Sequence, residues 1–329
     1  MKLKLLWLIA WASAPVFCAS AQFNGYWDIT VHESQVNEQG NPRPRRAWWL
    51  KIEGAGTPQA KGMFSSAYNG NINPIDEIST QDDNLMFGFR PVERRRDGTT
   101  APARHLVYKA RLVGGKLDGT FEVEGGNRPP IKWTGVRTPP INDKDDGTWI
   151  EGKAVTLFNG KDLSGWHPVV PKGEAGWVVE NGLLISTGTG SDIISEAKFW
   201  NFNLHLEYRL PKPSNSGIGL RSRYEVQIGG DYGRPPGTHS TGALYAQVAP
   251  SENAGKPVGE WGTFDIRLIG KQVSITLNGK KVIDKADFEA MTAVSIDPNE
   301  AEPGPLMLQG DHGTVEFRNI VVTPLVKKK

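Results

Sequence analysis

The stretch NLHLEYRLPKPSNSGIGLRSRYEVQI, residues 203–228, decides the fold of the C-terminal half of this chain. Apolar and polar side chains alternate strictly over residues 203–210, which predicts a β-strand with one face on a core and the other face open. A turn at residues 215–217 follows, and the alternation then resumes. We therefore predict two neighbouring strands whose polar faces lie together.

The second strand carries a row of charged and hydrogen-bonding groups. Its apolar face holds Ile218, Leu220, Tyr224, Val226 and Ile228, and its other face holds Gly219, Arg221, Arg223, Glu225 and Gln227. On the first strand, His205 and Glu207 share the corresponding polar face. Gly and Gln beside paired Arg and Glu are more typical of a ligand-binding face than of a solvated one, so we predict that this face is functional.

The whole chain is predicted to be all-β. It contains 38 Gly, 23 Pro and 11 Trp among 329 residues, a composition that suits short strands joined by turns. No long segment places apolar residues at helical spacing. A chain of this length is expected to form two domains.

A polar, turn-rich stretch divides the chain. We predict a small antiparallel β-barrel or sandwich domain at residues 22–140, a linker at 141–153 and a second domain at 154–326. The acidic cluster of the linker lacks the ligand spacing of a calcium loop, so we expect it to be solvated. In the first domain, strands are expected at 25–31, 48–52, 85–89, 105–111, 117–123 and 131–137, with a hairpin turn at Gly114-Gly115.

Residues 1–21 have the layout of a secretory signal peptide. Lys2 and Lys4 precede an apolar run, and Ala19-Ser20-Ala21 is a small-residue cleavage site, which predicts a mature chain starting at Gln22. The run is shorter than a membrane span requires. A lipid anchor on Cys18 is disfavoured by the bulky Phe17 before it. We therefore expect a periplasmic or extracellular protein without a membrane span.

Composition excludes several classes of function. Cys18 is the only cysteine, so a mature chain starting at Gln22 has no disulfide, cysteine zinc site or thiol nucleophile. The net charge is +2, and removal of Lys2 and Lys4 brings it to 0. A neutral chain without a basic run has no electrostatic footprint for nucleic acid.

Residues 154–326 resemble the 3-keto-disaccharide hydrolase family. The motifs that carry the resemblance are LFNGKDLSGW at 157–166, Trp177 with ENGLL at 180–184, NSGI at 215–218, YEVQI at 224–228, TGALY at 241–245, Lys256-Pro257 with GEW at 259–261, LNG at 277–279, Gln309-Gly310, His312-Gly313 and FRNI at 317–320. The resemblance implies a concanavalin-like jelly roll of two antiparallel sheets, with a sugar on the concave face.

The resemblance also implies a substrate with a ketone at sugar carbon 3. The ketone acidifies the proton on carbon 2, so a base can form an enolate, the group on carbon 1 leaves by β-elimination, and water then adds back. Such a site needs a base, a partner for the enolate oxygen and an acid for the leaving oxygen. Glu225 is our first candidate for the base and Glu207 the second; His239 and His312 are candidates for the acid or for a metal ligand.

We predict that Arg221, Gln227, Trp261, Tyr245 and Gln309 bind substrate. Arg221 and Gln227 share the face of Glu225, while Trp261 and Tyr245 are either sugar platforms or core aromatics. A divalent metal would polarise the ketone, but no tight motif of ligands specifies one.

Two other functions remain open to the sequence. A non-catalytic carbohydrate-binding protein is the main alternative, although such modules favour aromatic platforms over a row of charged groups. A conventional glycosidase needs two carboxylates, and the strand at 224–228 offers one carboxylate and one amide.

Overall fold

The computed structural model of the protein describes residues 19–32, 46–66, 70–75, 77–91, 104–170 and 176–328. The apolar run and Cys18 of the expected signal peptide lie outside the described residues. Ala19–Phe23 form the 3-10 helix η1, in which the Ser20 hydroxyl donates to the Thr80 carbonyl. No helix in these ranges has the length and apolar character needed to cross a membrane.

The N-terminal domain is a curled antiparallel sheet. Over the described residues its order is β4-β3-β2-β1-β9-β8-β7-β6-β5, and β3 and β4 contact β5 and β6, so the two edges of the sheet approach each other. The strands are β1 (Gly25–Val31), β2 (Ala47–Glu53), β3 (Lys61–Ser65), β4 (Ile72–Ile75), β5 (Glu77–Gln81), β6 (Asn84–Phe89), β7 (Leu106–Val113), β8 (Lys116–Val123) and β9 (Ile131–Arg137). All six predicted strands are confirmed; β3, β4 and β5 were not predicted.

Aromatic rings fill the inside of this curled sheet. Trp27, Trp133 and Tyr108 are fully buried there, and the Arg137 guanidinium lies 4.4 Å from the ring centre of Trp27. Gly114 and Gly115 have φ of 56° and 79°, which confirms the predicted hairpin turn. Because side chains occupy the interior, this domain is a packed body rather than a ligand-holding barrel.

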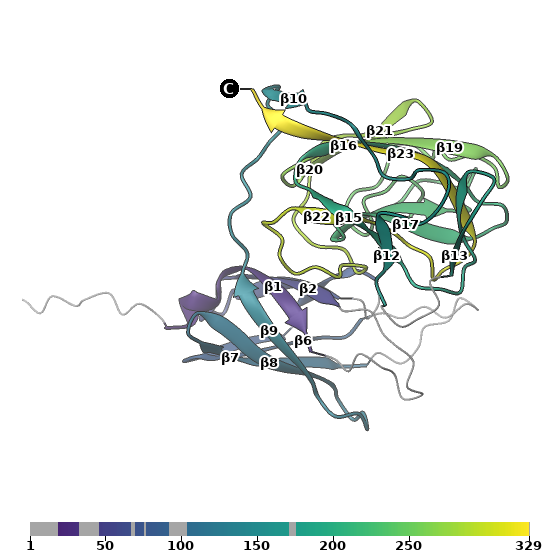
Figure 1. Ribbon diagram of the computed structural model, residues 1–329. Helices are drawn as coiled ribbons and strands as arrows, with labels where there is room; N and C mark the ends of the chain where they lie inside the picture. Colours follow the sequence, from purple (N-terminus) through teal and green to yellow (C-terminus); the bar gives the residue numbers. More distant parts are fainter. Residues whose placement is uncertain are drawn as a thin grey trace, which may run out of the picture.

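The C-terminal domain is a sandwich of two antiparallel sheets, as predicted (Figure 1). In the described chain, the front sheet has the order β12-β15-β22-β17-β18, and the back sheet the order β13-β14-β23-β16-β19-β20-β21, with β10 and β11 also paired to β23. The front strands are β12 (Trp166–Pro168), β15 (Ile193–Phe199), β17 (Asn215–Leu220), β18 (Tyr224–Gly229) and β22 (Gly304–Leu308). The back strands are β10 (Trp149–Glu151), β11 (Val155–Thr156), β13 (Trp177–Glu180), β14 (Leu183–Ser186), β16 (Phe202–Arg209), β19 (Trp261–Ile269), β20 (Gln272–Leu277), β21 (Lys280–Asp287) and β23 (Val315–Lys327).

The alternation in residues 203–228 predicts correctly which side chains form the core. Leu204, Leu206, Tyr208, Ile218, Leu220, Tyr224, Val226 and Ile228 are all buried in one cluster between the two sheets. However, β16 and β17 are not neighbours, because the chain crosses from the back sheet to the front sheet between them. Their polar faces therefore point away from the core in opposite directions, and the prediction that the two faces lie together is wrong.

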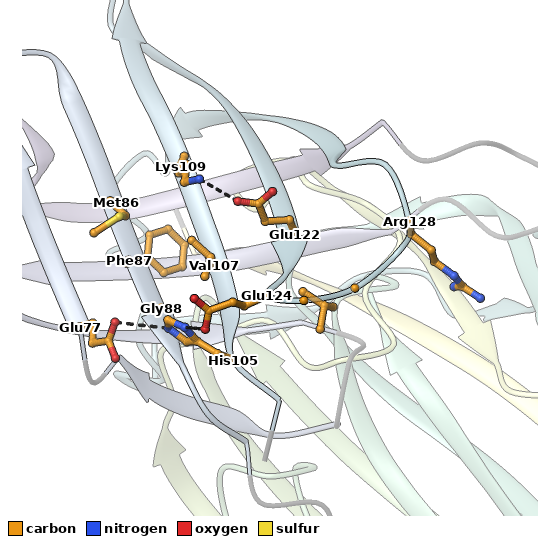
Figure 2. A pocket seen from close by; sticks show the side chains of 13 residues that line it. Glu77, Met86, Phe87, Gly88, His105, Val107, Lys109, Glu122, Glu124 and Arg128 are labelled. Atoms are coloured by element: carbon orange, nitrogen blue, oxygen red, sulfur yellow. Dashed lines mark hydrogen bonds and ion pairs between the residues drawn. The ribbon is translucent and has the colours of Figure 1, made fainter. Parts of the chain in front are cut away.

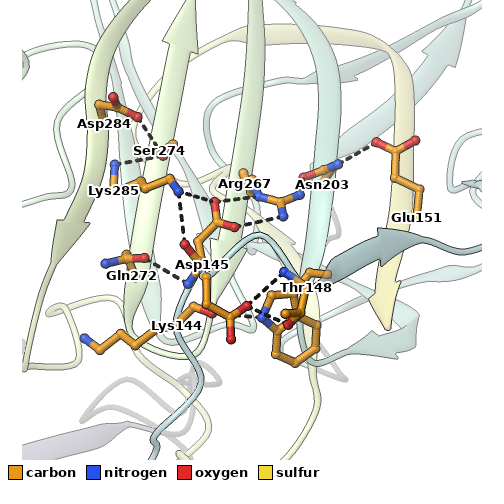
Figure 3. Close-up of polar contacts among 12 residues, drawn as sticks. Lys144, Asp145, Thr148, Glu151, Asn203, Arg267, Gln272, Ser274, Asp284 and Lys285 are labelled. Atoms are coloured by element: carbon orange, nitrogen blue, oxygen red, sulfur yellow. Dashed lines mark hydrogen bonds and ion pairs between the residues drawn. The ribbon is translucent and has the colours of Figure 1, made fainter. Parts of the chain in front are cut away.

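The linker at 141–153 is bonded to the back sheet rather than solvated (Figure 3). The Asp145 carboxylate receives two hydrogen bonds from Arg267, at 2.9 and 3.1 Å. Asp143 accepts hydrogen bonds from Trp200 and Asn201. Trp149–Glu151 then form β10 beside β23. The acidic cluster is thus an anchor that fixes where the N-terminal domain leaves the sandwich.

The N-terminal domain packs against the C-terminal domain on the side of the front sheet (Figure 1). Trp48 and Trp49 in β2 point to opposite faces: Trp48 packs edge-to-face on Tyr108, while Trp49 joins the core cluster of the C-terminal domain. The Ala47 amide donates to the Ser295 carbonyl at 3.0 Å. A strand buried on both faces explains why residues 47–50 show no alternation.

Arg221 is a structural residue and not a ligand of substrate. It begins the turn between β17 and β18 with φ of 53°, and its side chain is fully buried. Its guanidinium donates to the Trp200 and Gly270 carbonyls at 2.6 and 3.1 Å and to Asn201 Oδ1 at 3.0 Å. The alternation breaks at this turn, so the predicted placement of Arg221 on the open face is wrong.

Arg221→Ala is expected to destabilise the protein strongly, because it leaves three buried acceptors without their charged donor. Hydrogen bonds to charged groups contribute about 1.5–3 kcal/mol each, so the free energy of unfolding should fall by about 3 kcal/mol or more in urea denaturation. Arg111→Ala, at an exposed position in β7, serves as the control and should change it by less than about 0.5 kcal/mol. Equal stability of the two variants would contradict the structural role.

Candidate functional site

The polar face of the front sheet has a defined pattern of side chains. Strand register places Glu225 opposite Gly219 and Gln227 opposite Gly217. Met307 of β22 pairs with Gly219 on the side away from β18, and the backbone N–H of Gln309 donates to the Gly217 carbonyl at 3.0 Å. Since paired residues share a face, Glu225, Gln227 and Gln309 project from one surface with glycine between them.

Glu225 is a buried carboxyl group on this face, in the edge strand β18, with 3% of its surface exposed. A Cβ at Gly217 would lie 2.9 Å from Glu225 Cγ, so only glycine leaves room for this side chain. The Gln227 amide, with its nitrogen turned to the carboxyl, lies 3.3 Å from Glu225 Oε1. Burial raises the pKa of Glu225 to about 8, and the nearby charge of His312 opposes this shift.

His312 and two aspartates stand near Glu225. His312 Nδ1 is hydrogen-bonded to Asp311 Oδ1, and this bond raises the pKa of His312. Burial and the charge of Asp311 raise the pKa of Asp192 to about 6. Burial alone would raise the pKa of Asp311, but its bond to His312 and the charge of that ring lower it. The bond to Asp311 therefore favours the protonated form of His312 next to Glu225.

Tyr245 and His239 approach Glu225 from the loop that follows β18. Leu244 forms a β-bridge with Val226, and the Tyr245 amide donates to the Glu225 carbonyl at 2.9 Å. The rings of His239 and Tyr245 meet edge to face, with 4.6 Å between their centres. His239 Nε2 is hydrogen-bonded at 3.0 Å to Asn71 Oδ1, which belongs to the N-terminal domain.

The structure separates two predicted site residues from this group. Glu207 lies on the outer face of the back sheet, where Arg318 and Asn319 donate to its carboxylate. Burial would raise the pKa of Glu207, but these hydrogen bonds lower it overall. Trp261 lies on the same outer face, between the guanidinium groups of Arg209 and Arg318. Neither residue can act with Glu225, because the core of the sandwich lies between them.

Sequence reasoning missed Asp192, Gly217 and Asn71 as members of the group. The predicted turn at residues 215–217 is wrong, because β17 begins at Asn215 and places Gly217 on the polar face, two residues before Gly219. These two glycines could have been interpreted as space for a partner side chain. Asp192 and Asn71 carry no local signal, since tertiary packing alone brings them near Glu225. The strand at 224–228 has one carboxylate, but Asp192 and Asp311 from other segments lie near Glu225. The number of carboxylates in one strand therefore does not give the number in the site.

The sequence alone does not indicate whether the site binds a divalent metal ion. Within the described ranges, no three His, Cys, Asp or Glu side chains are arranged to hold a metal ion.

The N-terminal domain has a separate pocket on its outer surface (Figure 2). It has a volume of about 400 Å³, and several of its charged lining groups are paired with each other. Lys109 Nζ lies 2.7 Å from Glu122 Oε1, and His105 Nδ1 lies 2.9 Å from Glu124 Oε2. The side chains of Lys109, Glu122 and Glu124 are exposed and paired, whereas Glu225 is buried and its pKa is raised. The Glu225 group is therefore the stronger candidate for a functional site.

Comparison with known proteins supports this choice of domain. Residues 153–323, just over half of the chain, match the 3-keto-alpha-glucoside-1,2-lyase-like domain. A Bacteroides thetaiotaomicron protein named 3-keto-disaccharide hydrolase is 34% identical over 77 residues. This match spans 20% of the chain and only 26% of that relative.

Solved structures give more distant similarities. Two crystal structures of Parabacteroides distasonis proteins, assigned provisionally to the glycosyl hydrolases, have TM-scores of 0.45 and 0.42 and sequence identities of 22% and 24%. Each match covers 53% of this chain, and they cover 94% and 100% of the two solved chains. Similarities at this level carry no information about activity.

The pKa of Glu225 predicts how stability depends on pH. Its folded-state pKa of about 8 exceeds the ordinary value of 4.5, so the folded protein holds a proton that the unfolded chain has lost. The folded protein is therefore most stable, as far as Glu225 is concerned, below pH 4.5. Its free energy of unfolding falls by up to about 1.4 kcal/mol per pH unit as the pH rises from 4.5 to about 8. Between pH 5.5 and 8.5, Glu225→Gln should therefore gain stability relative to wild type in urea denaturation.

Glu207→Gln is the matched control, because the pKa of Glu207 is lowered and its carboxylate stays ionised across that range. The stability of this variant should run parallel to wild type. A parallel curve for Glu225→Gln as well would refute the raised pKa.

Proposed function

Because the chain belongs to the family of 3-keto-alpha-glucoside-1,2-lyase-like domains, we propose that it cleaves 3-keto-glycosides, with Glu225 as the base that removes the proton from sugar carbon 2. The observation that carries this proposal is the buried carboxyl of Glu225, whose pKa of about 8 lies close to neutral pH. A base with such a pKa is strong enough to take a weakly acidic carbon-bound proton and is still partly ionised.

The groups around Glu225 supply the other requirements of the reaction. His312, held by Asp311, offers a positive charge to the oxygen of the enolate. Gln309 Oε1 is buried and has no hydrogen-bond partner in the described chain, which suits an acceptor for a sugar hydroxyl. Gln227 holds Glu225 and presents its amide to the same face.

In the proposed reaction Glu225 takes the proton from carbon 2, and the electron pair moves onto the oxygen at carbon 3. The enolate then collapses, the carbon 1–oxygen bond breaks, and a double bond forms between carbons 1 and 2. Water adds back at carbon 1 while carbon 2 regains a proton, so the net reaction is hydrolysis. The ketone makes the first step possible, which explains why one base is enough.

Conventional hydrolysis by a pair of carboxylates is the competing mechanism, because Asp192 and Asp311 lie near Glu225. Asp311 is bonded to His312, and Asp192 accepts from the Gly310 amide. Both carboxylates thus have partners inside the protein. The two mechanisms differ in their need for the ketone, and this difference gives the test.

Glu225→Gln is expected to lower kcat on a p-nitrophenyl 3-keto-glucoside by about 10²–10⁴-fold with little change in KM, because the amide keeps the size of the side chain but is not basic. Aglycone release can be followed by absorbance. Glu207→Gln, in the back sheet, should retain wild-type rates. Equal wild-type rates on the keto sugar and its unoxidised parent would contradict the elimination mechanism; binding without turnover would indicate a carbohydrate-binding protein.

We also propose that the protein is exported, as the charged start, apolar run and Ala19-Ser20-Ala21 site indicate. Mass spectrometry of the protein from its natural host should find Gln22 at the N-terminus. Removal of Ser20 would cost its contact with Thr80, whereas the Gln22 and Asn24 carbonyls would keep their bonds from Arg137. An intact Met1 or a lipid on Cys18 would contradict the proposal.

A further inference from the structure

Tyr245 lies next to the candidate base on the same face. The backbone bridge between Leu244 and Val226 puts Leu244 in the core with Val226, and the next pair along is Tyr245 and Glu225. Side chains alternate along each strand, and residues opposite each other in an antiparallel pair share a face. Tyr245 therefore projects from the face that carries Glu225. The charge of Glu225 reaches the Tyr245 hydroxyl. That hydroxyl makes no hydrogen bond to any described residue.

Glu225 stands between Tyr245 and His312. The front sheet runs β22-β17-β18, and the segment of Tyr245 continues it beyond β18, whereas His312 follows β22 on the opposite side. A sugar over Glu225 would therefore have His312 on one side and Tyr245 on the other. This is the arrangement that an elimination needs, with the enolate oxygen and the leaving oxygen on different ring carbons.

The N-terminal domain holds Tyr245 in place. A Cβ at Gly70 would lie 3.2 Å from Tyr245 Oη, so the backbone before β4 comes close to the hydroxyl. The adjacent Asn71 contacts His239, whose ring packs on the Tyr245 ring. Gly70 has φ of +73°, a conformation that favours glycine and lets the chain turn here.

His239 is suited to positioning rather than to proton transfer. Its Nε2 is hydrogen-bonded to Asn71 Oδ1 at 3.0 Å, and its Nδ1 to Thr238 Oγ1 at 3.2 Å. An amide oxygen only accepts, so Nε2 carries the proton and Nδ1 accepts from the threonine hydroxyl. Partial burial lowers the pKa of His239, which keeps the ring neutral. Both ring nitrogens are thus occupied inside the protein.

We infer that Tyr245 is the acid that protonates the leaving oxygen, and that the N-terminal domain is part of the active site because Asn71 positions Tyr245 through His239. The inference rests on the proposed cleavage of 3-keto-glycosides. It assigns the predicted acid to a tyrosine rather than to His239, and it gives the N-terminal domain a role in catalysis.

The proton transfers balance over the full reaction. As the carbon 1–oxygen bond breaks, the Tyr245 hydroxyl gives its proton to the departing oxygen and becomes a phenolate. Water then adds its hydroxide to carbon 1 and its proton returns to Tyr245, while Glu225 returns its proton to carbon 2. Burial and the charge of Glu225 raise the pKa of Tyr245, so the hydroxyl is protonated at neutral pH.

The experiment compares two leaving groups. Tyr245→Phe and the wild type are assayed on p-nitrophenyl and methyl 3-keto-glucosides, because p-nitrophenolate leaves without a proton and methoxide does not. Tyr245→Phe should lose about 10²-fold or more in kcat on the methyl glycoside and less than about 10-fold on the p-nitrophenyl glycoside. Asn71→Ala should show the same selective loss to a smaller degree, which a purely structural defect would not produce.

Asn84→Ala, at an exposed position in β6 of the same domain, is the matched control for Asn71→Ala and should behave as wild type on both substrates. Hydrogen exchange at carbon 2 in deuterated water should persist in Tyr245→Phe, because the base is intact. Equal losses on both substrates, or no loss on either, would overturn the assignment. If the proposed function itself is wrong, the result is different: the wild type would neither exchange the proton at carbon 2 nor cleave either substrate.

Discussion

The burial of a single carboxyl group, that of Glu225, shapes the rest of this site. Glu225 can lie on this face of β18 only because the neighbouring strand offers Gly217, where a Cβ would collide with the Glu225 side chain. Loss of contact with water raises the pKa of Glu225 to about 8. A surface carboxylate at the same place would be ionised but too weak a base for a carbon-bound proton.

The domain interface supports this burial. Tyr224, which precedes Glu225, donates to Glu300 Oε1 at 2.8 Å, and the Glu300 amide donates to Asp28 Oδ2 of the N-terminal domain at 3.2 Å. Lys271 neutralises part of this acidic group at 2.6 Å from Glu300. These bonds, together with Trp49 in the shared core, fix the N-terminal domain against the strand that carries Glu225. The two domains therefore act as one frame around the site.

Local pattern in the sequence predicted six strands of the N-terminal domain, the core residues within 203–228 and the face on which Glu225 lies, because alternation depends only on neighbouring residues. It failed at Glu207, since alternation identifies a face but not the sheet to which the face belongs. Trp261 was chosen for its residue type alone, which does not indicate a sheet either. The local pattern failed at Arg221 because two consecutive residues with positive φ interrupt the alternation. Asn71 and Asp192 were beyond reach, because only long-range packing brings residues from other segments to Glu225.

Hydrogen exchange at carbon 2 of a 3-keto-glucoside in deuterated water, followed by NMR as a function of pH, tests the central claim most directly. It reports removal of the carbon 2 proton whether or not the glycosidic bond then breaks. The account predicts that wild-type exchange increases with pH around a midpoint near 8, the pKa of Glu225, and that Glu225→Gln abolishes it. A midpoint near the ordinary glutamate pKa of 4.5, or undiminished exchange in Glu225→Gln, would contradict it.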